Sequence, residues 1–131
     1  MAENTLVEGL WTDTVVLIKK LDKGEFSPTF AVWYFYEDAD QWRFLLGGPR
    51  FDDLLPKQEP LAYQKVSEAI SVCDLTTLSI SLVKLVSLDT PLINALKFLV
   101  GTGEKGLVQA TFSNTTLNGI FIKDIVVVRS A

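Results

Sequence analysis

The segment AVWYFYEDADQWRFLLGG, residues 31–48, constrains the fold more than any other part of this 131-residue chain. Two short aromatic-rich runs, residues 30–36 and 42–46, are separated by the Asp-rich stretch EDADQ. Runs of β-prone residues on either side of a turn-forming stretch are typical of a β-hairpin. We therefore predict two antiparallel strands here.

The parity of the hairpin loop decides which side chains share a face, because side chains alternate along a strand. An even loop leaves Tyr34, Tyr36 and Arg43 on one face and places four large apolar side chains on the other: Trp33, Phe35, Trp42 and Phe44. An odd loop brings Arg43 next to the apolar side chains of the first strand. We expect the even loop, because it keeps the Arg43 head group out of the core. It also allows Arg43 to contact a tyrosine ring through a cation–π interaction.

Three segments have the apolar spacing of an amphipathic helix. The first is residues 5–23, with Thr5 and Glu8 as a capping box and Gly24 as the stop. A strand over residues 15–21 is the alternative, since several residues there are β-branched. The second helix starts at Pro60, and the third follows DTP at residues 89–91 and ends at Gly101.

Three further strands complete the expected fold. Residues 78–88 alternate apolar and polar as far as Leu82 and then lose that phase, where a bulge is expected. Residues 107–113 and 119–129 form a strand pair around NTTLN, and residues 47–60 form a loop. We expect one α+β domain, residues 1–131, in the order α-β-β-α-β-α-β-β. Its sheet is mainly antiparallel and five-stranded, its three helices lie mostly on one face, and its strand order is open.

Charge, hydropathy and cysteine content argue against several functional classes. The net charge is -4, with 12 basic and 16 acidic residues, whereas nucleic-acid binding relies on basic residues. No apolar run is long enough to cross a bilayer, and the N-terminus lacks the pattern of a secretory signal. The single cysteine, Cys73, agrees with a reducing compartment. We expect a cytoplasmic protein with no nucleic-acid or membrane partner and no cofactor.

Residues that usually carry catalysis are scarce. The chain has no histidine, which removes the commonest general acid/base and nearly all zinc sites. GTGEKG at residues 101–106 has the glycines of a dinucleotide motif, but a helix precedes it and a strand follows, the reverse of what that motif needs. We therefore expect a connecting turn. Glu37, Asp38 and Asp40 are expected at a solvated hairpin tip rather than around a metal ion.

The remaining polar candidates each have a structural explanation. Arg50 is expected to form a surface ion pair beside Asp52 and Asp53 in a loop. Asp124 interrupts an apolar strand and is either paired in the interior or turned outward by a bulge. The neighbouring Lys123 favours the outward position. Cys73 is expected to be a small buried residue.

The motifs DADQWRFLL, PLAYQKVSEAI, DTPLINALKFLV and NGIFIKDIVVVR resemble those of a group of small bacterial α+β proteins with no known activity. The resemblance covers most of residues 30–129. It implies an intact small domain of bacterial or phage origin and supplies no catalytic residue.

Three functional hypotheses remain. The first is a non-enzymatic module that binds a protein partner, or a second copy of itself as a homodimer, through an exposed sheet face or edge, with Tyr34, Tyr36 and Arg43 on that face. The second is a small-molecule-binding domain with a pocket beside the aromatic hairpin, where Arg43 or Arg50 meets an anionic group. The third, which the lack of histidine places last, is a carboxylate- or metal-dependent enzyme that uses Asp52, Asp53 or Asp124.

Overall fold

The computed structural model describes residues 8–103 and 105–131. Its sheet has the strand order β3-β2-β1-β5-β4, in which β2 and β3 are parallel and the other neighbours antiparallel. The strands are β1 (Phe30–Tyr36), β2 (Gln41–Gly47), β3 (Val83–Leu85), β4 (Ala110–Leu117) and β5 (Ile120–Ser130). The helices are α1 (Glu8–Asp22), α2 (Pro49–Leu54), α3 (Glu59–Val72), the 3₁₀ turn η1 (Ile80–Leu82) and α4 (Pro91–Lys97).

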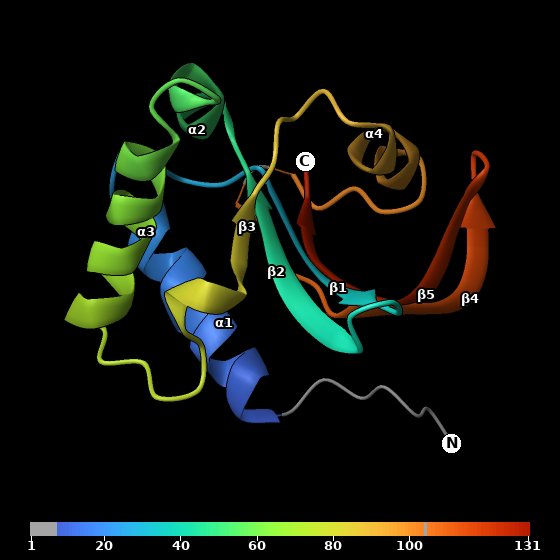
Figure 1. Cartoon of the computed structure of the whole chain (residues 1–131), viewed down its shortest axis with the longest axis horizontal. Helices are drawn as coiled ribbons and strands as arrows, with labels where there is room; N and C mark the ends of the chain where they lie inside the picture. The colour runs from blue at the N-terminus through green and yellow to red at the C-terminus, as the bar shows by residue number, and fades with distance from the viewer. Residues whose placement is uncertain (1–7, 104) are drawn as a thin grey trace.

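Helices cover both faces of this sheet. Figure 1 shows α1 and α3 on one side and α4 on the other, where β5 and β4 curve around it. The larger core joins α1, α2 and α3 to the sheet and includes Leu17, Trp33, Phe44, Phe51, Val66 and Val126. The smaller core lies under α4 and includes Phe30, Val32, Leu45, Ile93, Leu96, Ile125 and Val127. The predicted α+β class with five strands is confirmed, but the sheet is mixed and the described chain has four α-helices.

The additional helix is α2, which replaces part of the loop expected at residues 47–60. Pro49 occupies its first turn, where a missing N–H costs nothing, and Asp52 adds a favourable negative charge there. Phe51 is fully buried in the larger core and packs against Phe26 with ring centroids 5.3 Å apart. Burial of this one aromatic side chain anchors a helix whose sequence is otherwise typical of a loop.

The aromatic hairpin has the expected even loop. Four residues, 37–40, connect β1 to β2, and the register pairs Trp33 with Phe44 and Tyr34 with Arg43. Trp33 is fully buried and stacks on Phe44 with ring centroids 4.9 Å apart. Its indole N–H donates a 2.8 Å hydrogen bond to Thr14 on α1. The hairpin face that carries Trp33 is therefore core.

The first helix is confirmed from Glu8 onward, and the alternative strand over residues 15–21 is wrong. Leu17, Ile18 and Leu21 form its buried stripe. The capping residue Thr5 lies outside the described residues.

The strand predicted at residues 78–88 is wrong in extent. Only Val83–Leu85 pairs with β2, immediately after η1. Val83 and Leu85 are buried and Lys84 is exposed, so the true strand lies where the expected alternation breaks down. η1 occupies Ile80–Leu82, so β3 begins only at Val83, and its ladder with residues 44–46 of β2 ends at Leu85.

The pairing of the last two strands is confirmed, but their turn lies later than predicted. β4 continues through most of NTTLN, and Asn118 and Gly119 form the turn with φ of 48° and 81°. Positive φ at both central residues is the geometry that Asn-Gly favours in a two-residue hairpin turn. The third predicted helix is also shorter, since α4 ends at Lys97 rather than near Gly101.

Candidate functional site

Tyr34, Tyr36 and Arg43 lie together on the sheet face that α4 covers only in part. All three are half-buried, and the two tyrosine rings pack with centroids 4.9 Å apart. Sequence reasoning did not single out Lys84. It pairs with Leu45 in the parallel β2–β3 ladder, so its side chain lies on the same sheet face as Arg43 and the two tyrosines. We call these four residues the tyrosine surface.

The contacts of the tyrosine surface are long and exposed. The Tyr34 hydroxyl donates to the Phe121 carbonyl at 3.4 Å, and Arg43 donates to the Ser81 carbonyl at 3.4 Å. The Lys84 ammonium donates to the Tyr36 hydroxyl at 3.5 Å and lies 5.5 Å from the ring centroid. The cation over a tyrosine is therefore Lys84, not Arg43 as the sequence suggested.

Tyr34 stays a neutral hydrogen-bond donor at neutral pH. Its burial, followed by its electrostatic interaction with Tyr36, raises the pKa of the Tyr34 hydroxyl above its ordinary value of 10.0. The Tyr34 hydroxyl therefore gives this surface a polar but uncharged group.

Arg50 lies away from this surface. It is on α2, where its guanidinium contacts Glu25 at 3.2 Å and Asp53 at 3.7 Å, with all three side chains exposed. The surface ion pair expected for Arg50 is confirmed, and the structure does not bring Arg50 and Arg43 together. Asp52 accepts the Leu88 backbone N–H at 3.2 Å, which ties the segment after β3 to α2.

Asp124 is paired rather than turned outward, so the favoured prediction for this residue is wrong. It is 5% exposed, and it accepts a short hydrogen bond from the Ser113 hydroxyl. Ser113 is directly opposite Asp124 in the β4–β5 ladder. A hydroxyl on the partner strand therefore makes burial of this carboxylate possible.

The acidic tip and the cysteine offer no metal site. Glu37, Asp38 and Asp40 are exposed, as expected for a solvated tip. Within residues 8–103 and 105–131, no group of three His, Cys, Asp or Glu residues is placed to hold a metal ion. Cys73 follows the last residue of α3 and is half-exposed, which corrects the expectation that it is buried.

The glycine-rich segment 101–106 belongs to the connection between α4 and β4, as predicted, although Glu104 lies outside the described residues. Gly103 has a φ of 76°. Gly106 lies so close to Thr102 that an added Cβ would stand 2.1 Å from the Thr102 carbonyl oxygen. Gly103 and Gly106 therefore allow a tight turn of the backbone that a larger residue would not.

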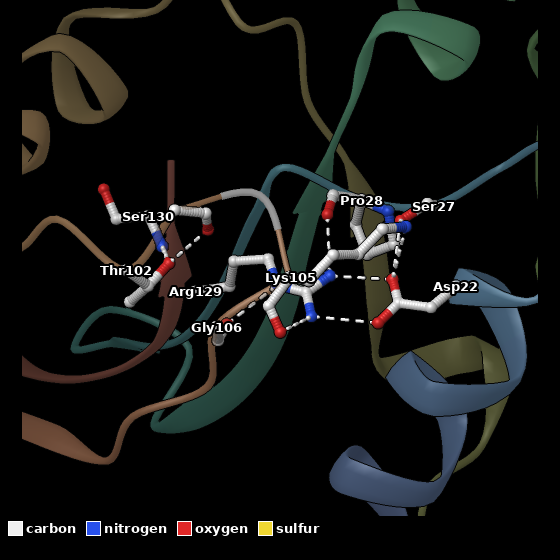
Figure 2. Close-up of polar contacts among 9 residues, drawn as sticks. Asp22, Ser27, Pro28, Thr102, Lys105, Gly106, Arg129 and Ser130 are labelled. Carbon is white, nitrogen blue, oxygen red and sulfur yellow. Dashed lines mark hydrogen bonds and ion pairs between the residues drawn. The ribbon is translucent and has the colours of Figure 1, made fainter.

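Arg129 is a second polar residue, after Lys84, that sequence reasoning missed. Its side chain is fully buried, and its guanidinium contacts both carboxylate oxygens of Asp22, at 2.8 and 2.9 Å (Figure 2). The same guanidinium donates to the carbonyls of Pro28, Lys105 and Gly106. The only available signal was an arginine after the apolar run VVV, because its partner is 107 residues away.

Asp22 remains ionised in this network. Its burial raises the pKa, but hydrogen bonds from Arg129 and Ser27 and the charges of Arg129 and Lys105 together lower the pKa of Asp22 below its ordinary value of 3.8. The pair joins the end of α1 to β5, and the bonds from Arg129 to Lys105 and Gly106 add the loop before β4, so its role is structural.

β4 presents a second candidate surface at the end of the sheet (Figure 1). Its sequence, ATFSNTTL, contains neither charge nor proline, and Asn114 interrupts it with a φ of 48°. Phe98 and Leu99, just after α4, are 87% and 50% exposed. They share a hollow of about 330 Å³ with Thr116 and Leu117. We call β4 with Phe98 and Leu99 the β4 edge.

Comparison with known proteins gives no relative: no family model, curated protein or solved structure matches this chain. The resemblance based on the sequence motifs therefore stays a prediction. Each helix in the described part of the chain is too short or too polar to cross a membrane.

Proposed function

We propose that this protein is a non-enzymatic interaction module that associates with a second copy of itself through the β4 edge. The observation that carries the proposal is that β5 pairs with one side of β4, while no described strand pairs with the other. Unpaired N–H and C=O groups along such a strand are a template for strand addition. Two copies related by a two-fold axis can pair their β4 strands antiparallel.

The apolar side chains beside β4 add a driving force. Among the described residues, Phe98 is the most exposed of the large hydrophobic side chains, at 87%, and it lines the same hollow as Leu99 and Leu117. Burying a phenylalanine side chain contributes about 1.5–3 kcal/mol, and a symmetric interface gains this twice. Because Asn114 interrupts the strand, we expect a short pairing and a reversible dimer.

The absence of charge on β4 favours pairing with another uncharged strand, as a second copy supplies, over pairing with a charged partner. Natural edge strands commonly carry lysine or proline, which block pairing, and β4 has neither. Each copy nevertheless has a net charge of -4, so the two copies repel one another at a distance. Added salt screens this repulsion and should strengthen the association.

Light scattering coupled to size-exclusion chromatography over a concentration series tests this proposal. The wild-type mass should rise toward that of two chains, and Phe98→Ser should keep the protein monomeric. Val72→Ser is the matched control, since Val72 is 69% exposed at the end of α3 on the opposite side of the sheet. A wild-type protein that stays monomeric, or equal effects of the two substitutions, would contradict the proposal.

The proposal retains two expectations from the sequence. A cytoplasmic location is supported by the single cysteine, which has no internal partner for a disulfide. A protein partner rather than nucleic acid is supported by the excess of acidic over basic residues.

A further inference from the structure

We infer that the tyrosine surface binds a small ligand in which a phosphate group is joined to a flat ring. This site is separate from the β4 edge and goes beyond self-association. Its phosphate end would be held by Arg43, Lys84 and the Tyr36 hydroxyl, and its ring would occupy the hollow beside Tyr34 and Tyr36.

The phosphate end is formed by donors from three adjacent strands. Arg43 is on β2, Lys84 on β3 and Tyr36 on β1, and the Lys84 ammonium already reaches the Tyr36 hydroxyl. In the described part of the chain, neither Arg43 nor Lys84 forms an ion pair with a carboxylate, whereas Arg50, Lys105 and Arg129 all do. A guanidinium fork and an ammonium without counter-charges suit a phosphate with several acceptor oxygens.

The ring end is formed on the other side of β1. A hollow of about 220 Å³ lies where β1 and β5 separate, and its aromatic lining includes Tyr34, Tyr36 and Phe121. Phe121 is 53% exposed, so its ring is available to a ligand. Aromatic walls of this kind pack against a flat ring.

Polar groups at the end of the hollow define the ring further. Glu37 and Asp38 line it at the hairpin tip and Lys123 lines it from β5, and the two carboxylates accept hydrogen bonds from amino or hydroxyl groups. Across the sheet, Arg43 on β2 and Phe121 on β5 are separated by two strand spacings, roughly 10 Å, and Phe121 also lies four residues along β5 from Ile125, the residue in register with Tyr34 and Arg43. A ligand that reaches from one to the other carries its anionic group and its hydrogen-donating ring at opposite ends, as a nucleoside monophosphate does.

Isothermal titration calorimetry on the full chain tests this site with adenosine monophosphate, adenosine and inorganic phosphate as probes. Adenosine monophosphate should bind at least tenfold more tightly than either fragment. Lys84→Gln and Arg43→Gln should each weaken its binding at least tenfold, and Lys84 is exposed, so its replacement should leave the fold intact. Lys57→Gln, which removes an exposed charge between α2 and α3, should have no effect.

Three results would overturn the assignment. The first is no heat of binding from adenosine monophosphate. The second is phosphate alone binding as tightly, which would mean that the aromatic hollow contributes nothing. The third is an equal loss in Lys57→Gln, which would show attraction by general charge rather than by this site.

Discussion

Replacing Asp22 by asparagine should cost about 3 kcal/mol of folding free energy at neutral pH. The Arg129 side chain is 0% exposed, and each of its five N–H groups donates a hydrogen bond, two of them to Asp22. Asparagine keeps the shape of Asp22 but removes its charge, which leaves a buried cation. Breaking one side of such a pair costs about 3–5 kcal/mol. Arg129 keeps its three carbonyl acceptors in the variant, and the Asp22 side chain is 19% exposed. We therefore expect a loss of stability at the lower end of this range.

Urea unfolding followed by tryptophan fluorescence measures this loss. Lys105→Met is the control, because the Lys105 ammonium is 3.7 Å from Asp22 but its side chain is 61% exposed. A pair of that kind contributes less than about 1 kcal/mol. If Asp22→Asn stayed within about 1 kcal/mol of the wild type, or if Lys105→Met cost as much, the structural role assigned to the buried pair would be wrong.

The pH dependence of the same substitution gives an independent check. The pKa of Asp22 is lowered in the folded state from its ordinary value of 3.8. The stability that its ionised form contributes is therefore present above pH 3.8 and is lost as the pH falls through the lower folded pKa. The difference in unfolding free energy between wild type and Asp22→Asn should accordingly be constant near neutral pH and shrink below pH 3.8. A difference that stays the same at low pH would refute this.

Two further substitutions test the core and the loop before β4. Thr14→Val should lower the free energy of unfolding by about 1–3 kcal/mol, because the buried Trp33 N–H loses its acceptor. An unchanged midpoint in urea unfolding would contradict this. Gly106→Ala should lower the free energy of unfolding by about 1–3 kcal/mol, because the added Cβ would collide with the Thr102 carbonyl. Gly101→Ala should change the melting temperature little, because no atom lies within 4 Å of the Cβ added there. Equal melting temperatures for the two alanine variants would contradict the tight path at Gly106.

Local patterns predicted the parts of the fold whose signals lie close together in the chain. Alternation along the two hairpin strands, together with the cost of burying Arg43, was sufficient to choose the register that pairs Trp33 with Phe44. The helical stripe of Leu17, Ile18 and Leu21 likewise identified α1.

The parts that were missed depend on partners far away in the sequence. β3 is defined by its pairing with three residues of β2, and α2 is anchored by burial of Phe51. Asp124 is buried because Ser113 faces it across the ladder, which alternation along one strand does not reveal. Lys84 joined the tyrosine surface only through the parallel pairing of β3 with β2.

Amide hydrogen exchange at low and high protein concentration tests the proposed association through β4 most directly. If two copies pair along this strand, amides within residues 110–117 should exchange more slowly at high concentration, and those of the covered strand β1 should not change. In Phe98→Ser the concentration dependence should disappear. Exchange in β4 that is the same at both concentrations, while the wild-type protein forms dimers, would show that another surface makes the contact.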